Sequence, residues 1–225
     1  MNDLYLNGIP DLFHERARAA LEAGNAVGFL CLADNTLGLD LVEMNRQALV
    51  ERGIYEAALL HALTAPRLNF HDIPRARIAW LLHSADREKL RAAGEPLAGE
   101  SPVQLYRGVA GRGPARRVRG LHWTGSFQQA QWFACRFDWL DAPSVFEATV
   151  PASAILAYIL DRGEDEYLVN LPGSVRPKRV WTRACPAQQS GLDGYEISRG
   201  LTHSQLGITE RYLARGGGDV VNGEI

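Results

Sequence analysis

Hydrophobic positions over the first hundred residues recur with the spacing of helices. Over residues 10–24, for example, Phe13, Ala17 and Leu21 fall on one face, and Gly24 marks the end of the segment. The same pattern predicts further helices over 40–52 and 54–65, from Pro74 onward, and from a Ser84 cap to Gly94. We therefore predict a mainly helical region over residues 1–98.

One segment of this region departs from the helical spacing. Residues 26–33 read AVGFLCLA, a short and continuous apolar run. Such a run is typical of a buried strand, although a helical turn has the same appearance over so few residues. We predict a strand here and keep the helical turn as the alternative.

The pattern changes after residue 98. Short segments rich in β-branched and aromatic residues alternate with Gly, Pro and Asp, which predicts strands at VQLYRGV, RGLHWT, VFEATV, AILAYIL and EYLVNL. Between the second and third lies SFQQAQWFACRF, whose spacing predicts a helix with Ser126 as its cap. Residues 99–185 are thus predicted to form an antiparallel α+β unit. A glycine-rich extension follows over 186–225, with a short helix expected near 208–215.

Composition and charge narrow the class of protein. The chain has 225 residues, of which 46% are hydrophobic, so a disordered chain is excluded. With 24 basic and 26 acidic residues its formal charge is −2, so any site for a polyanion must be local. Three widely spaced cysteines, Cys31, Cys135 and Cys185, indicate no disulfide framework and suit a reducing cytosol.

The sequence shows no sign of export or of a membrane span. The N-terminus carries acidic residues where a signal peptide needs basic ones. No uncharged run reaches the roughly 18 residues that a spanning helix requires. We expect a cytoplasmic protein without a membrane partner.

Several catalytic motifs are missing from the chain. H-E-x-x-H, G-x-x-x-x-G-K-[ST] and G-x-S-x-G do not occur, so the sequence gives no motif for a zinc protease, a P-loop enzyme or an α/β-hydrolase. The six histidines show no ligand spacing, and we expect no metal.

The first candidate site residue is an arginine at the end of a predicted strand. Arg107 lies in LYRGV and is followed by Gly108. A planar guanidinium suits phosphate oxygens, and a glycine lets the backbone approach a ligand closely. For a lone arginine, a surface ion pair is the commoner explanation.

The second candidate segment is GLHWTGSFQQAQWFA, residues 120–134. Here a strand turns directly into a helix, which places a hydroxyl and several N–H groups where a ribose or an amide can be held. An ordinary turn capped by Ser126 explains the same residues equally well.

The third candidate segment is RGEDEYLV, residues 162–169. In an extended chain Glu164 and Glu166 point the same way. A solvated acidic turn is the usual explanation of such a run. The apolar strand that begins directly after Glu166 favours a carboxylate at the wall of a cleft.

In this order, the three segments resemble the mono-ADP-ribosyltransferase superfamily of the arginine–serine–glutamate type, which includes bacterial toxins and phage-encoded transferases. The resemblance covers residues 100–185 and rests on LYRGV, on HWT before a helix, and on EDEYLV. It implies a split pair of small β-sheets with NAD+ bound as a substrate in the cleft between them. The expected fold is then α+β, a helical region followed by an ADP-ribosyltransferase-like split β-sandwich.

The resemblance also implies a role for each matching residue. Arg107, with Gly108 beside it, would bind the phosphates and ribose of NAD+. Thr124 would support the nicotinamide ribose and the catalytic glutamate. Glu166 would hold the ribose 2′-hydroxyl and stabilise the oxocarbenium-like state that forms when the nicotinamide bond breaks. Glu164 stands where family members that modify arginine carry a second glutamate, which orients or deprotonates the acceptor guanidinium.

Two positions of the cofactor-binding strand differ from the family pattern. His122 stands where the first serine is usual, and Trp123 stands where threonine or serine is usual. A histidine can replace the serine as a hydrogen-bond donor to the ribose, as it does in the diphtheria-like branch. A histidine between Leu121 and Trp123 on a strand is about as often structural.

The function implied is NAD+-dependent mono-ADP-ribosylation of a macromolecular acceptor. The second glutamate favours a protein arginine over a nucleic acid, and water as acceptor would make the protein an NAD+ glycohydrolase. The alternative from another class is a non-catalytic interaction protein on the same scaffold. Three roles of the helical region are consistent with the sequence: recognition of the target, cover of the cleft, and binding of a neutralising partner.

Loop arginines and aromatic side chains complete the candidates. The arginines that follow Arg107 are Arg112, Arg116, Arg117 and Arg119. They either steer an anionic ligand or form a solvated turn balanced by acids such as Asp161 and Asp165, and the solvated turn is favoured. Trp132 and Phe133 are predicted to be core residues, which leaves Phe137 or Trp139 as a candidate for stacking on nicotinamide.

Overall fold

The three-dimensional structure is a computed structural model of the chain. It describes residues 4–65, 73–97, 99, 102–113, 116–137, 139–160 and 165–183. Three predictions fall outside these residues: the helix near 208–215, the carboxylate of Asp161 and the position of Glu164.

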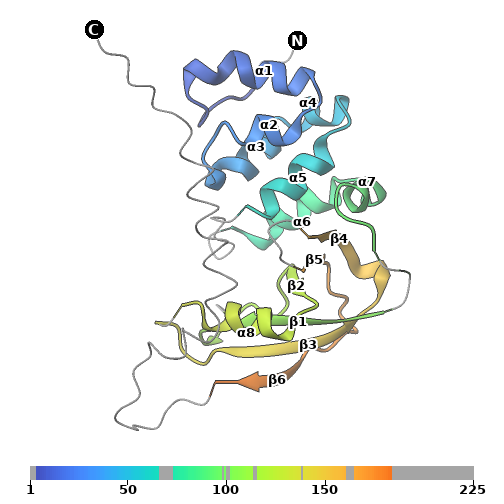
Figure 1. The fold of residues 1–225 in the computed structure, drawn as a ribbon. Coiled ribbons are helices and arrows are strands. Elements are labelled where there is room, and N and C mark those ends of the chain that lie inside the picture. The colour runs from blue at the N-terminus through green and yellow to red at the C-terminus, as the bar shows by residue number, and fades with distance from the viewer. Residues whose placement is uncertain are drawn as a thin grey trace. The chain divides into compact units, whose positions relative to one another are not determined.

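Helices dominate the first hundred residues, as the hydrophobic pattern predicts (Figure 1). In chain order they are η1 (Asp11–Phe13), α1 (His14–Glu22), α2 (Ala26–Leu30), η2 (Asn35–Leu37), α3 (Gly38–Met44), α4 (Arg46–Glu51), α5 (Tyr55–Leu63), α6 (Arg75–His83) and α7 (Arg87–Ala92). As predicted, α6 begins directly after Pro74.

The prediction of a strand over residues 26–33 is wrong, because α2 occupies this segment. The side chain of Asn25 accepts a hydrogen bond from Gly28 N at 2.7 Å, which is the cap that starts a helix. Phe29 and Leu30 are buried. The continuous apolar run is thus a short buried helix.

Two further helix boundaries differ from the prediction. Asn45 divides the helix expected over 40–52, and its buried amide exchanges hydrogen bonds of 2.8 Å with both main-chain groups of Tyr5. Asp86, not Ser84, caps α7, because its carboxylate accepts from the main-chain N–H groups of Glu88 and Lys89.

In the described residues, six strands form one antiparallel sheet in the order β4-β5-β2-β1-β3-β6. The strands are β1 (Val103–Val109), β2 (His122–Thr124), β3 (Ser144–Val150), β4 (Ile155–Ile159), β5 (Glu166–Val169) and β6 (Lys178–Thr182). β1 pairs with β3 along its whole length but with β2 only at Tyr106 and Thr124. Two three-stranded halves, β4-β5-β2 and β1-β3-β6, therefore meet at a narrow junction.

The fold class is α+β, as expected, and one strand was missed by the sequence pattern. β6 lies at the edge of the sheet and is mostly exposed, with Lys178 and Arg179 at its start. Charged residues are common on edge strands, because they discourage pairing with another chain. Such a strand carries little of the apolar alternation by which strands are recognised.

The helix α8 (Phe127–Cys135) packs against β1 at Gly108. As predicted, the Ser126 hydroxyl caps this helix by accepting from Gln129 N at 3.2 Å. A Cβ atom at position 108 would lie 1.9 Å from the carbonyl oxygen of Ala130 and 2.6 Å from the nitrogen of Ala134. The helix can approach the strand this closely because Gly108 has no side chain.

Two clusters of buried side chains cover the sheet on opposite sides of β5. Leu168 belongs to a large cluster that also contains the helical core and Leu156 and Ala157 of β4. Its neighbour Val169 belongs to a second cluster with Leu105, Trp123 and two residues of β3, Ala148 and Val150. The helical region therefore shares one hydrophobic core with β4 and β5.

Replacing Gly108 by alanine should destabilise the protein by about 1–3 kcal/mol or more, since the added Cβ would clash with the rigid backbone of α8. Urea denaturation followed by far-ultraviolet circular dichroism would measure this change. Gly173→Ala is the control, because no atom of the described residues lies within 4 Å of the added Cβ there and little change is expected. Equal stability of the two variants would contradict the packing described for α8.

Candidate active site

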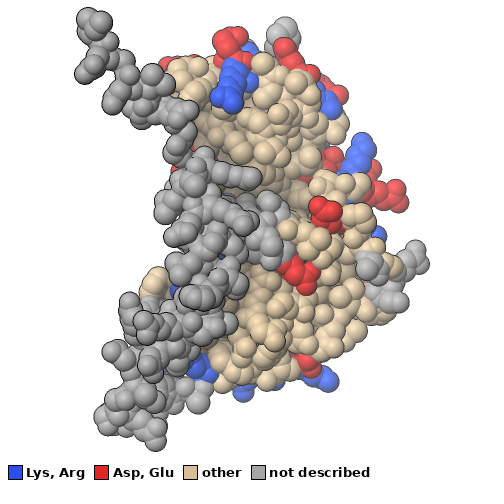
Figure 2. Space-filling view, viewed as in Figure 1, with Lys and Arg blue, Asp and Glu red and all other residues tan. Residues whose placement is uncertain are grey.

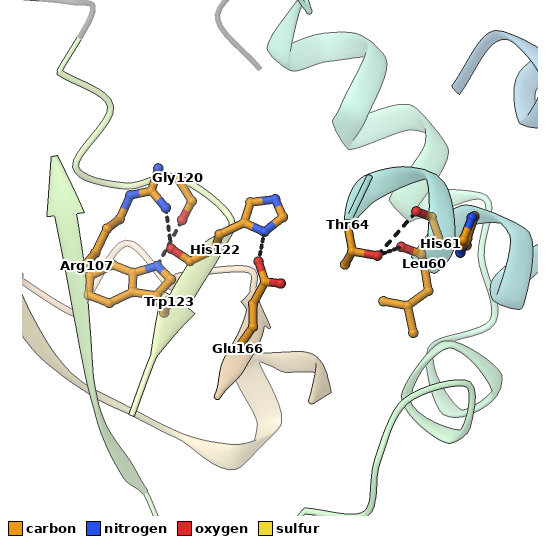
Figure 3. A network of polar contacts seen from close by, with 8 residues as sticks. All are labelled: Leu60, His61, Thr64, Arg107, Gly120, His122, Trp123 and Glu166. Carbon is orange, nitrogen blue, oxygen red and sulfur yellow. Dashed lines mark hydrogen bonds and ion pairs between the residues drawn. The ribbon is translucent and has the colours of Figure 1, made fainter. Parts of the chain in front are cut away.

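Three neighbouring strands bring together three of the residues singled out in the sequence. Arg107 comes from β1, His122 from β2 and Glu166 from β5. Figure 3 shows the imidazole of His122 directed toward the carboxylate of Glu166, with the Arg107 guanidinium next to the main chain of His122. Residues 59 positions apart in the chain thus form one polar network.

The contact between His122 and Glu166 follows from the strand register. Thr124 pairs with Glu166, and His122 pairs with Leu168. His122 and Glu166 are therefore diagonal neighbours on the same face, a separation that long side chains bridge. Nδ1 of His122 contacts Oε1 of Glu166, and each side chain keeps 22% of its surface exposed. The pair is held by the fold and is still accessible to a ligand.

The guanidinium of Arg107 binds one main-chain oxygen at the start of β2 and one in the segment that precedes this strand. Its Nη1 donates to the carbonyl of His122, and its Nε donates to the carbonyl of Arg117 at 3.1 Å. A Cβ atom at Gly120 would lie 2.2 Å from Nη2, so the chain passes directly over the guanidinium. Burial lowers the pKa of Arg107 to about 10, while the charge of Glu166 opposes this decrease and that of Arg117 adds to it.

Three other predicted cofactor-binding residues, Trp123, Thr124 and Gly108, are not joined to this network by the hydrogen bonds described above. Trp123 is buried in the core, and its Nε1 donates to the carbonyl of Gly120 at 2.9 Å. In Figure 3 its indole lies on the Arg107 side of β2, away from the His122 imidazole. This placement follows from strand alternation, which sends successive side chains to opposite faces.

Thr124 is buried and joins the end of β2 to α8. Its hydroxyl donates to the Gln129 side chain at 3.0 Å and accepts from the main-chain nitrogen of Ser126 at 3.0 Å. Gly108 likewise contacts α8. These two residues support the site through packing in the structure.

A pocket of about 420 Å³ adjoins Arg107 and His122. It is bounded on one side by α6 and α7 and on the other by the segment that leads into β2. Its volume lies within the range of small-molecule sites. No acidic residue occurs among the described residues of its wall. Five arginines line it, namely Arg75, Arg87, Arg107, Arg117 and Arg119.

Sequence reasoning missed the contribution of the helices to this pocket. Arg75 and Arg87 each lie in the first turn of a short helix and are exposed. Nothing in their local sequence distinguishes them from ordinary surface arginines. Only the packing of α6 and α7 beside the sheet brings them to the same pocket as Arg107.

The loop arginines are held by specific partners. Arg119 donates to the carbonyls of Leu171, Pro172 and Val175 at 2.6–2.9 Å. Arg112 forms an exposed ion pair with Asp141 at 3.5 Å, where the sequence analysis named other acids as candidates. Arg116 donates to the hydroxyl of Ser144 and lies over the ring of Phe146.

The aromatic side chains of α8 are less buried than predicted. Trp132 is 39% exposed, so its assignment to the core is wrong; the buried residues of this helix are Ala130 and Ala134. Beyond the helix, the rings of Phe137 and Trp139 contact one another with centroids 4.9 Å apart. Trp139 is 74% exposed.

Charge is mixed on the face of the molecule drawn in Figure 2. Basic and acidic side chains lie near one another over the helical region, and uncharged residues cover most of the remaining described surface. The concentration of arginines in the pocket thus differs from the charge distribution on this face.

Within the described residues, no group of three or more His, Cys, Asp and Glu side chains is arranged to hold a metal ion. None of the described helices has the length and apolar character needed to cross a membrane. No protein-family model, no curated protein and no solved structure matches the chain.

Replacing Arg107 by alanine should lower the free energy of unfolding by about 1–3 kcal/mol, because it removes the hydrogen bonds that the guanidinium donates to the carbonyls of Arg117 and His122. Arg107→Lys should not restore the loss, since an ammonium cannot reproduce the planar fork. Arg112→Ala is the control and should cost at most about 1 kcal/mol, as expected of an exposed ion pair. Urea denaturation would test this, and a lysine variant as stable as the wild type would argue against the fork geometry.

Proposed function

We propose that this protein is an NAD+-dependent mono-ADP-ribosyltransferase that transfers ADP-ribose to an arginine side chain of a protein. The observation that carries the proposal is the convergence of Arg107, His122 and Glu166. Each lies in one of the three segments that resemble the family, and hydrogen bonds join the three residues in the structure. A chance resemblance of separate segments would not require these residues to contact one another.

The arrangement of the strands supports the same proposal. The resemblance implies a split pair of small sheets, and the sheet consists of two three-stranded halves that meet at one residue pair, Tyr106 and Thr124. Arg107 lies on one side of this junction, and His122 and Glu166 lie on the other. We therefore propose an ADP-ribosyltransferase-like split β-sandwich as the detailed form of this α+β fold.

The reaction requires a negative charge next to the ribose. The bond between C1′ of the ribose and the nicotinamide nitrogen breaks, and its electron pair leaves with nicotinamide, so positive charge develops on the ribose. The carboxylate of Glu166 stabilises this charge and holds the 2′-hydroxyl. A nitrogen of the acceptor guanidinium then attacks C1′ and loses a proton, for which Glu164 is the proposed base.

His122 positions the catalytic carboxylate. Its imidazole faces Oε1 of Glu166, and its own main chain is held by Arg107. A group fixed before the substrate binds stabilises a transition state without reorganising during the reaction. The same imidazole is a candidate donor to the nicotinamide ribose.

Arg107 and the adjoining pocket fit the anionic part of NAD+. The guanidinium of Arg107 lies in the pocket wall with four further arginines. Phosphate oxygens are ligands that arginine binds well. A nearly neutral protein gains affinity for a dinucleotide when its cations are gathered at one place.

Glu166→Gln should reduce nicotinamide release and target labelling by about 10²-fold or more, the usual effect of removing a group that stabilises charge in a transition state. The glutamine keeps the size of the side chain and an acceptor for His122, so the fold should be retained. The measurement is incubation of purified protein with biotin-labelled NAD+ and a bacterial lysate, with blots of the protein and nucleic-acid fractions.

Glu147→Gln is the matched control for this experiment. Glu147 lies on β3 and its carboxylate accepts a hydrogen bond from Gln104 at 3.0 Å, outside the proposed site. It should label targets like the wild type. Substantial turnover by Glu166→Gln, or no nicotinamide release by the wild type at millimolar NAD+, would refute the proposed function.

The class of acceptor is tested by Glu164→Ala. If an arginine is the acceptor, this variant should lose protein labelling and retain release of nicotinamide, because the attack of water does not need the second glutamate. Labelled nucleic acid with the wild type would instead identify a nucleic-acid acceptor. Release of nicotinamide by the wild type without any label would identify an NAD+ glycohydrolase.

A further inference from the structure

The pocket beside Arg107 gathers positive charge from two parts of the fold. Arg75 of α6 and Arg87 of α7 face the same cavity as Arg107, Arg117 and Arg119. A guanidinium stays protonated at any physiological pH, and like charges around a volume of about 420 Å³ repel one another. Since the described wall of the pocket has no acid, an anionic ligand would relieve this repulsion.

The arginines differ in the contacts they already make. Arg107 and Arg119 donate to main-chain carbonyls, so part of their hydrogen-bonding capacity serves the fold. Arg75 and Arg87 are exposed, and no hydrogen bond or ion pair joins either of them to another described residue. Their donors are therefore available to a ligand.

The rest of the pocket wall is largely apolar. Side chains of the helices and of the sheet contribute to it, among them Ile78, Leu82, Leu90, Leu121 and Leu156. A small inorganic anion would leave this apolar surface unused. A nucleotide carries both a phosphate group and a flat, weakly polar ring, so its chemistry matches both parts of the wall.

We propose that Arg75 and Arg87 bind the diphosphate of a nucleotide in this pocket, together with Arg107. Insofar as that nucleotide is NAD+, this inference rests on the proposed function. The helical region then forms part of the substrate site, a role that the sequence does not assign to it. Neither α6 nor α7 belongs to the segments that resemble the transferase family.

The test uses ADP, which has the diphosphate and the adenosine but no nicotinamide, so that binding is measured without turnover. Isothermal titration calorimetry would compare the wild-type chain of 225 residues with the double variant Arg75→Ala/Arg87→Ala. Loss of the two guanidinium groups should weaken ADP binding by about tenfold or more for each, the usual effect of a charge-assisted hydrogen bond. The unfolding temperature should not change, because both side chains are exposed and without partners among the described residues.

Lys89→Ala is the matched control on the same helix. Lys89 lies on α7 two residues after Arg87, is exposed, and is not among the residues that line the pocket. Like Arg87→Ala, this substitution removes one positive charge from α7, but at a position outside the pocket wall. ADP binding that weakens equally in Lys89→Ala would indicate general attraction by charge and would overturn the assignment of Arg75 and Arg87.

The outcomes separate this inference from the proposed function. If the wild type binds ADP in a manner that depends on Arg75 and Arg87 but releases no nicotinamide from NAD+, the pocket stands and the transferase proposal fails. If the wild type releases nicotinamide and the double variant binds ADP as tightly as the wild type, the transferase proposal stands and the inference fails. Absence of ADP binding by the wild type at millimolar concentration would also overturn the inference.

Discussion

The candidate site depends on the hydrogen bonds of the Arg107 guanidinium to the main chain of β2 and of the segment that precedes it. The two halves of the sheet pair at a single position, so few main-chain hydrogen bonds join β1 to β2. Arg107 adds bonds from its side chain to the carbonyls of Arg117 and His122. It therefore connects the two halves of the sheet. It also fixes the main chain of His122, whose imidazole contacts Glu166. A single partly buried arginine thus contributes both to the stability of the sheet and to the position of the Glu166 carboxylate.

The contacts of Arg107 with main-chain carbonyls and its proximity to Glu166 explain how an arginine is stable in a partly buried position. Taking a guanidinium out of water is costly unless its donors find acceptors. Main-chain oxygens satisfy them without cancelling the charge, and Glu166 contributes an attractive field. The cation consequently keeps its charge in the pocket wall, where a phosphate can contact it.

The sequence predicted local features well because they depend on neighbouring residues. The cap at Ser126 and the strand that ends at Val109 are local, and alternation along a strand identifies which residues share a face. Alternation also places the Trp123 side chain on the face opposite to that of His122. The resemblance to the transferase family nevertheless predicted Trp123 as a cofactor-binding residue, at a position where the family usually has threonine or serine. The strand predicted at residues 26–33 is wrong because an apolar run of this length does not distinguish a strand from a buried helix, and the cap at Asn25 favours the helix.

Features that depend on packing between distant segments could not be predicted from the sequence. The pairing of β2 with β5 brings His122 to Glu166, and the approach of α6 and α7 brings their arginines to the pocket. No pattern in the chain encodes these distances directly. The strand β6 was not predicted for a different reason, because an exposed edge strand lacks the buried apolar face by which strands are recognised.

The shared core of the helices with β4 and β5 has a consequence for how such a protein can change over evolutionary time. Leu156, Ala157 and Leu168 are buried among residues of the helical region. A recombination event that replaced this region with an unrelated module would uncover an apolar surface on the strand that carries Glu166. New specificity would therefore be acquired by gradual substitution on the surface of the helices, and the helical region and the sheet would be inherited as one piece.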